Sequence, residues 1–182
     1  YVDIYTSLWG AFDWVFENEE QAIILEEDCV PSIAFFDFCD QLLLKFKNDR
    51  RIWVISGNNF LEGYNPNNYD YFFSYFTFMY GWASWRDRWK NIIRGELPYE
   101  QIKEYRLYEQ LYANKKAAKI TLNFVRKIVN TPAWDHRFQV TIRCNGGFGI
   151  IPKINLVSNI GLFGEHNVGK ESIFHNRSLV VL

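Results

Sequence analysis

The sequence is poor in the residues that mark small secreted or metal-scaffolded proteins. Of 182 residues, only 3 are cysteine, 5 are proline and 1 is methionine. The cysteines have neither metal-ligand spacing nor the density of a disulfide scaffold. We therefore expect Cys29, Cys39 and Cys144 to be reduced and mostly buried thiols, which favours a cytoplasmic location.

Excess positive charge and long apolar runs are also missing. Lys and Arg number 20 against 21 Asp and Glu, for a formal net charge of −1. This balance provides no basic field for a nucleic acid, and no local basic patch stands out in the sequence. No stretch approaches the roughly 18 consecutive apolar residues of a membrane-spanning helix. We expect a soluble protein with no nucleic-acid partner and no transmembrane segment; contact with a membrane surface stays open.

The chain does contain enough apolar residues for one substantial core, because 48% of it is hydrophobic and 19% is aromatic. Apolar residues recur at helical spacing over residues 4–18 and 32–47, and Ser32 is the expected cap of the second helix. Short apolar runs at 22–25 and 52–56 predict buried strands on either side of that second helix. The pattern of strand, helix and strand predicts an α/β fold in a single domain.

In the rest of the chain, predicted helices and strands alternate less regularly. Residues 61–80 predict an ordered loop region, and residues 99–129 predict helix, broken near Asn114, with an apolar face of Ile120, Phe124 and Ile128. Another helix is predicted to begin at Ala133 and to stop at residues 145–147, Asn-Gly-Gly. Strand segments follow at 149–152 and 154–159.

The run from Ala22 to Leu25 stops abruptly in the carboxylates Glu26, Glu27 and Asp28. An acidic run is commonly a solvated turn that caps the next helix. At the end of a buried strand, however, three carboxylates cannot all face bulk water, and they are costly unless a cation neutralises them. Oxygen ligands suit Mg²⁺ or Mn²⁺, which often bridge to substrate phosphates. We therefore consider this triplet a candidate cation site.

Tryptophans cluster around residue 85. Trp82, Trp85 and Trp89 are spaced by three and four residues, which predicts one face of a short helix. Such rings are commonly core anchors. Alternatively, with Arg86 beside them, they suit stacking on the apolar face of a sugar.

Two further residues are candidates for chemistry. Asp135 follows Trp134 in the first turn of a predicted helix, where the helix dipole favours its ionised form; capping would explain it, and so would a role as a general base. His136 is the less suitable base, because it points to another side of the helix. His166 is most simply a surface residue, but next to the acids it would favour Mn²⁺ over Mg²⁺.

Five segments together resemble a known family, the bacterial nucleotide-diphospho-sugar transferases of the GT-A fold, which are similar to eukaryotic N-acetylglucosaminyltransferase I. The segments recur in the same order and cover nearly the whole chain. They are Ile24–Ser32 followed by Phe35-Phe36, then Ile55–Asn59, Gly81–Arg86, Trp134-Asp135 and Asn155–Gly161.

The resemblance implies a bacterial, metal-dependent glycosyltransferase of polysaccharide biosynthesis, which inverts configuration. Its partners are a nucleotide-diphosphate sugar and a glycan or glycolipid acceptor. The acidic triplet corresponds to the Asp-X-Asp-type motif of the family, so Glu26, Glu27 and Asp28 would bind the donor. Asp28 and His166 would hold Mn²⁺ or Mg²⁺. The family usually has Glu-Asp-Asp, so Glu27 is a departure that puts the role of the middle position in question.

The remaining roles also follow from the resemblance. Asp135 corresponds to the catalytic base, and Trp82, Trp85, Arg86 and Trp134 would line the acceptor side. The family's first nucleotide-binding strands have no counterpart before the first helix of this sequence. We therefore expect residues 1–182 to form the metal and acceptor half of a GT-A-like domain, incomplete at the N-terminus.

Two other functions stay open. An inactive or carbohydrate-binding remnant of such a domain would keep the aromatic cleft without turnover. A hydrolase would use two carboxylates, for example Asp28 and Asp135, on a glycosidic bond. We place it below the transferase because three clustered acids repel one another unless a metal is present.

Overall fold

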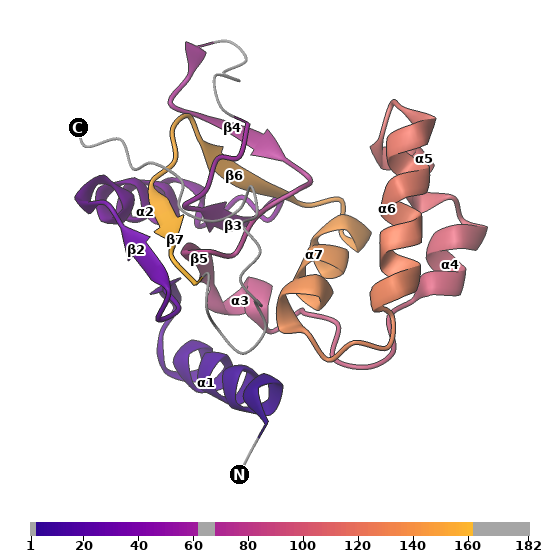
Figure 1. Ribbon diagram of the computed structural model, residues 1–182, viewed down its shortest axis with the longest axis horizontal. Helices are drawn as coiled ribbons and strands as arrows, with labels where there is room; N and C mark the ends of the chain where they lie inside the picture. Colours follow the sequence, from indigo (N-terminus) through magenta and orange to yellow (C-terminus); the bar gives the residue numbers. More distant parts are fainter. Residues whose placement is uncertain (1–2, 62–67, 162–182) are drawn as a thin grey trace. The chain divides into compact units, whose positions relative to one another are not determined.

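The computed structural model describes residues 3–61 and 68–161, which form two compact units. A helical unit combines the chain up to Glu20 with Arg86–Gly147, and a sheet unit combines Gln21–Trp85 with the chain from Phe148 onward. The helical unit holds α1 (Ile4–Asn18), α3 (Arg86–Trp89), α4 (Tyr99–Glu104), α5 (Leu107–Leu111), α6 (Lys115–Ile128) and α7 (Trp134–Cys144). The sheet unit holds β1 (Gln21–Ile24), β2 (Cys29–Pro31), α2 (Ile33–Phe46), β3 (Ile52–Ser56), β4 (Tyr71–Ser74), β5 (Trp82–Trp85), β6 (Phe148–Pro152) and β7 (Val157–Asn159). Figure 1 labels these elements.

The sheet unit is built on a mixed five-stranded sheet in the order β1-β5-β3-β6-β4. Strands β3 and β6 pair in parallel, and the other neighbouring strands pair antiparallel. Because β1 and β3 are each antiparallel to β5, they run in the same direction on either side of it. The predicted α/β class is confirmed. The predicted unit of strand, helix and strand corresponds to β1, α2 and β3, and β5 lies between β1 and β3 in the sheet. A separate ribbon pairs β2 with β7.

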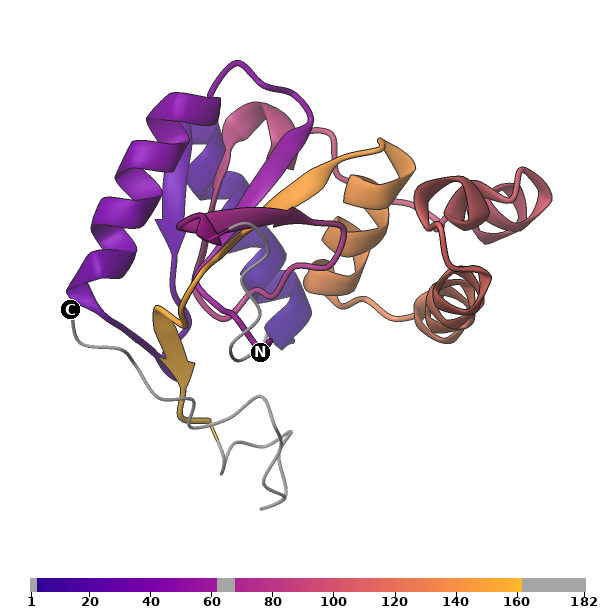
Figure 2. The same ribbon diagram turned by 90° about the horizontal axis from the view of Figure 1, so that it is seen from above.

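The core of the sheet unit lies between the sheet and α2, which packs over β1, β3 and β5 (Figure 2). The buried side of α2 consists of Phe35, Cys39, Leu42 and Leu43, as its helical spacing predicts. All five residues of β3 are buried, which confirms the expected buried strand. In contrast, β1 is an edge strand with half-buried side chains, so the prediction of full burial there is wrong.

Two apolar clusters stand out among the described residues of the helical unit. One is aromatic: Phe12 and Phe16 of α1 pack on Trp89, and Phe12 also lies edge-on to Trp134 with ring centroids 4.8 Å apart. The other joins α4, α5, α6 and α7 through residues such as Val125. These clusters explain why short helices, which are marginal alone, are stable here.

The predicted helix boundaries agree well where a cap or a breaker is present. Asn114 accepts hydrogen bonds from the amides of Lys116 and Ala117 and begins α6 as expected. Helix α7 ends before Gly146, whose φ is 62°. Ser32 stands at the N-cap of α2, but its hydroxyl makes no capping hydrogen bond.

Several predictions of local structure are wrong. Residues 82–85 form β5 and not a helix, and the region 61–80 contains the strand β4. The buried face of α6 consists of Ala118, Thr121, Val125 and Ile128, whereas Ile120 is largely exposed. No helix in the described part of the chain is long and apolar enough to cross a membrane.

Candidate functional site

The acidic triplet forms a tight turn after the edge strand β1. The turn is closed by the amide of Cys29, which donates to the carbonyl oxygen of Glu26 at 3.0 Å. Glu27 is exposed, and Glu26 and Asp28 are half-buried. The acids do not cap α2, because β2 separates them from it and Ser32 holds the N-cap position. The simple capping alternative is therefore excluded.

The ribbon of β2 and β7 places Asp28 against a segment 130 residues later in the chain. Cys29 pairs with Asn159, and the amide of Ile160 donates to the carbonyl oxygen of Asp28 at 2.8 Å. A Cβ atom at Gly161 would lie 2.2 Å from Oδ2 of Asp28 and 3.2 Å from Oδ1 of Asn159. The carboxylate of Asp28 and the side-chain oxygen of Asn159 therefore share the space above the Cα atom of Gly161.

Four of the five segments that resemble the transferase family meet at Val157, and the first of them does so through the pairing of Pro31 with Val157 in the ribbon. The amide of Val157 donates to the carbonyl oxygen of Gly57 at 3.1 Å, and Nδ2 of Asn58 donates to the carbonyl oxygen of Val157 at 2.9 Å. A Cβ atom would approach Cγ2 of Val157 to 2.4 Å from Gly57 and to 2.8 Å from Gly81. The amide of Gly57 also donates to the carbonyl oxygen of Gly81 at 2.8 Å. The absence of a side chain at Gly57 and Gly81 therefore lets the segments close together.

The thiol of Cys29 borders the acidic turn but remains protonated. Burial, together with the charges of Asp28 and Glu26, raises the pKa of Cys29 to about 12. Its Sγ donates to Oδ1 of Asp28 at 3.6 Å. All three cysteines are free, as expected, but only Cys39 is fully buried.

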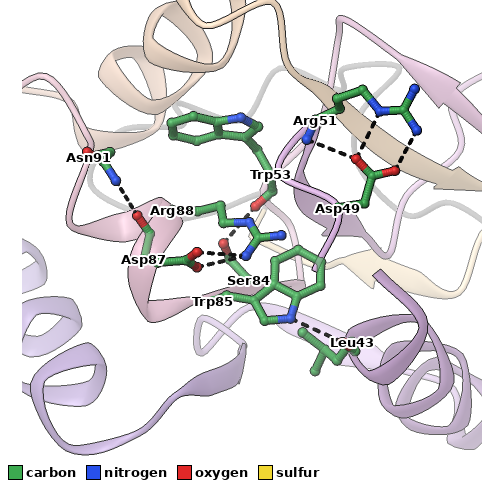
Figure 3. Close-up of polar contacts among 9 residues, drawn as sticks. All are labelled: Leu43, Asp49, Arg51, Trp53, Ser84, Trp85, Asp87, Arg88 and Asn91. Carbon is green, nitrogen blue, oxygen red and sulfur yellow. Dashed lines mark hydrogen bonds and ion pairs between the residues drawn. The ribbon is translucent and has the colours of Figure 1, made fainter. Parts of the chain in front are cut away.

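The tryptophans expected to stack on a sugar are in the core. Trp82 is 0% and Trp85 is 2% exposed, and three-residue spacing in β5 points them to opposite faces of the sheet. Nε1 of Trp85 donates a hydrogen bond to the carbonyl oxygen of Leu43 (Figure 3). Oγ of Ser84, the residue before Trp85 in β5, donates to the carbonyl oxygen of Trp53. The core-anchor alternative is confirmed for both rings, and neither offers a surface to a ligand.

The other predicted residues lie in the helical unit. Trp134 is 4% exposed and belongs to the aromatic cluster. Arg86 is half-buried, and its Nε donates to the carbonyl oxygen of Glu19 at 3.1 Å. Asp135, in the first turn of α7, keeps 43% of its side chain exposed, and its Oδ2 lies 3.8 Å from Nε2 of His136. Trp134 is therefore buried, whereas the carboxylate of Asp135 is open to solvent.

Two asparagines of the sheet unit were not singled out as ligands from the sequence: Asn159, near Asp28, and Asn58, beside Val157. Asn159 is 3% exposed, and its Oδ1 accepts from the amide of Gly161 at 3.0 Å. Oδ1 of Asn58 is buried without a hydrogen-bond partner among the described residues. The sequence feature that could have pointed to both residues is that each lies in a segment resembling the transferase family.

A cation would find oxygen ligands near Asp28, but not a complete set among the described residues. No three His, Cys, Asp or Glu side chains gather there closely enough to form a metal site within 3–61 and 68–161. His166, the predicted third metal-side residue, lies outside the described residues. Comparison with known proteins adds no further assignment: no family model and no curated protein matches this chain.

Proposed function

We propose that the chain is a metal-dependent glycosyltransferase, or part of one, that moves a sugar from a nucleotide-diphosphate donor to a glycan or glycolipid hydroxyl with inversion. One observation carries the proposal. Four segments chosen for their family resemblance, spread from Ile24 to Gly161, converge in the sheet unit around Val157 and Asp28. This juxtaposition supports a common role for these segments near the acidic turn.

The oxygens near Gly161 fit a hard cation. Asp28 contributes a carboxylate and Asn159 a side-chain carbonyl, and the missing side chain of Gly161 leaves the space that the Asp28 carboxylate occupies. Mg²⁺ and Mn²⁺ prefer oxygen ligands of this type, and they keep positions for phosphate oxygens. A cation held there would neutralise the charge of the leaving diphosphate. Glu26 and Glu27 border this site from the same turn.

In this proposal Asp135 is the general base. Its carboxylate takes the proton of the acceptor hydroxyl as the hydroxyl oxygen forms a bond to the anomeric carbon. The bond from that carbon to the diphosphate oxygen breaks in the same step, and the nucleoside diphosphate leaves. Asp135 stands in the first turn of α7 and keeps 43% of its side chain exposed, which leaves its carboxylate open to an acceptor hydroxyl.

An activity assay tests the proposal. A panel of UDP-, GDP- and dTDP-sugars is incubated with nitrophenyl glycosides as acceptors, in Mn²⁺ or in EDTA, and the released nucleoside diphosphate is measured. We expect release in Mn²⁺ only, and a decrease of at least about 100-fold in Asp135→Asn, because a general base contributes factors of this order. The neighbouring change His136→Gln serves as the control and should cost far less.

The same assay separates the alternatives. Cleavage of the glycoside that persists in EDTA would favour the hydrolase and exclude the transferase. Binding of glycosides without release of nucleoside diphosphate from any donor would favour the carbohydrate-binding alternative. A larger loss in His136→Gln than in Asp135→Asn would show that Asp135 is not the base.

A further inference from the structure

The helical unit contains a second candidate site, a cavity of about 330 Å³ between α4, α5 and α6. These three helices lie side by side (Figure 1). The apolar part of the cavity wall comes from Ile102, Ala118 and Leu122, and the nearly buried Tyr108 also contributes. Its volume is at the lower end of the range of about 300 to 1,000 Å³ that is typical of small-molecule sites.

The charge around this cavity is strongly one-sided. Four basic residues line it, against the single acid Glu109: Lys103, Arg106, Lys115 and Lys119. Arg106 forms an ion pair with Glu109, and Lys103 lies 3.8 Å from Glu100. Within the described residues, Lys115 and Lys119 take part in no ion pair. The hydrogen bond from Arg106 and the charge of Lys115 both lower the pKa of Glu109, but this one acid faces four basic residues, so the rim keeps a net positive charge.

The position of these cations on α6 is unfavourable for the isolated helix. Lys115 stands at its first residue and Lys119 one turn later, and no acid occupies the first turn. The N-terminal end of a helix already carries a partial positive charge, so lysines there lower helix stability and acids would raise it. Because the two lysines are four residues apart, they project from the same side of the helix. An anion bound at this end would relieve the repulsion.

The backbone at the other side of the cavity is also unusual. Arg106, between α4 and α5, has a φ of 51° and a ψ of 37°, the left-handed region that side chains other than glycine seldom adopt. This turn changes the direction of the chain and brings Arg106 to the cavity that α6 also lines. The arrangement places basic groups from two segments around one apolar hollow.

We propose that this cavity binds a small amphipathic anion, a carboxylate or phosphate monoester that carries a short apolar or aromatic group. Lys115 and Lys119 would hold the charged group in charge-assisted hydrogen bonds. The apolar group would pack on Ile102 and Leu122. The site lies wholly within the helical unit and does not depend on the transferase proposal.

Isothermal titration of the full chain tests this site with four probes: octanoate, phenyl phosphate, neutral octanamide and inorganic phosphate. At least one of the two amphipathic anions should bind, and which of them binds more tightly distinguishes a carboxylate ligand from a phosphate ester. Octanamide and inorganic phosphate should each bind at least about tenfold more weakly, because each lacks one of the two kinds of contact.

Paired lysine variants locate the binding. The double change Lys115→Gln with Lys119→Gln should weaken binding of the anion by about tenfold or more, equivalent to the loss of a charge-assisted contact. Lys116→Gln with Lys127→Gln is the matched control, because it removes the same charge from the same helix outside the cavity lining and should leave the affinity nearly unchanged. Far-ultraviolet circular dichroism checks that both variants fold.

Three results would overturn the proposal. The first is no binding of either amphipathic anion to the folded protein at millimolar concentration. The second is equal binding of octanoate and octanamide, or of phenyl phosphate and inorganic phosphate. The third is an equal loss of affinity in the two double variants, which would indicate a general effect of net charge.

Discussion

The Cα atom of Gly161 lies so close to Asp28 that a Cβ atom there would come within 2.2 Å of the carboxylate oxygen Oδ2. Such a contact is far shorter than packed atoms allow, so a side chain at this position must displace the carboxylate or move the end of β7. The close approach of Gly161 to the Asp28 carboxylate joins two residues 133 positions apart in the chain, which the pairing of β2 with β7 brings together.

This relationship predicts the effect of Gly161→Ala. The added methyl group should shift the Asp28 carboxylate and weaken Mn²⁺-dependent nucleotide binding by about tenfold or more, comparable to the loss of a group that orients a metal ligand. Gly95→Ala is the control, because no atom lies within 4 Å of a Cβ atom there. Unchanged binding in Gly161→Ala would mean that Asp28 does not hold the cation.

A second prediction concerns Asp13 of α1 and the acid stability of the helical unit. Its Oδ1 accepts from Nε1 of Trp89 at 2.7 Å, and Arg94 donates to both of its oxygens. Burial alone would raise the pKa of Asp13, but the hydrogen bonds from Arg94 and Trp89 outweigh it and hold the pKa below the ordinary 3.8. The ionised form of Asp13 is therefore preferred in the folded state.

The sign of the pH effect follows from this direction. A depressed pKa adds stability that is fully present above the pKa of the unfolded chain and is lost as the pH falls through the pKa of the folded state. Asp13→Asn should lower the free energy of unfolding at pH 7 by at most about 1 kcal/mol, since the pair is partly exposed. Denaturant unfolding from pH 7 to pH 2.5 should show the difference between the proteins shrinking below about pH 3.8. A difference that grows with acid would contradict this account.

A third prediction compares two tyrosines of the helical unit. The hydroxyl of Tyr108 is buried without a hydrogen-bond partner in the described structure, and burial raises its pKa well above the usual value. The hydroxyl of Tyr112 accepts from Nε of the buried Arg143 at 3.2 Å. Removal of an unsatisfied hydroxyl should be neutral or stabilising, whereas removal of a partner from a buried cation is costly.

Tyr108→Phe should therefore leave the free energy of unfolding unchanged or raise it by up to about 1 kcal/mol, and Tyr112→Phe should lower it by about 1–3 kcal/mol. Urea denaturation of the two variants measures both values. The reverse order would indicate that the Tyr108 hydroxyl has a partner that stabilises the fold.

The sequence predicts those elements whose signals are local. Asn114 caps α6, the Gly146 turn ends α7, and the run of five apolar and small residues in β3 is long enough to show burial on both faces. In each case the deciding contact lies within a few residues, so spacing and capping chemistry are sufficient.

The sequence fails where distant strands decide the structure. The spacing of Trp82 and Trp85 suits a helix face, but pairing with β1 and β3 makes this segment an interior strand whose two faces are both covered. Aromatic residues also favour strands, and here tertiary context decides. Strand β1 has an apolar sequence like that of β3, yet it pairs on one side only and remains half-buried.

In the candidate site, too, some residues can be identified from local sequence and others only from the pairing of distant strands. The acidic turn and Asp135 could be identified from sequence, because their carboxylates follow a strand or begin a helix. The contribution of Asn159 and Gly161 could not be predicted from local pattern, because it arises from the pairing of β2 with β7. The burial of Trp134 likewise depends on Phe12 of α1, more than a hundred residues earlier.

The most direct test of the transferase account is a titration of Mn²⁺ and nucleoside diphosphates into the full chain and into Asp28→Asn. The account predicts nucleotide binding that requires Mn²⁺ and that weakens by about 10- to 100-fold in Asp28→Asn, the range seen when a metal-site group is lost. Asp37→Asn, an exposed change on α2, should bind as the parent chain does. Equal binding in Asp28→Asn, or absence of metal-dependent binding to UDP, GDP and dTDP even when the family's nucleotide-binding strands are supplied, would contradict the account.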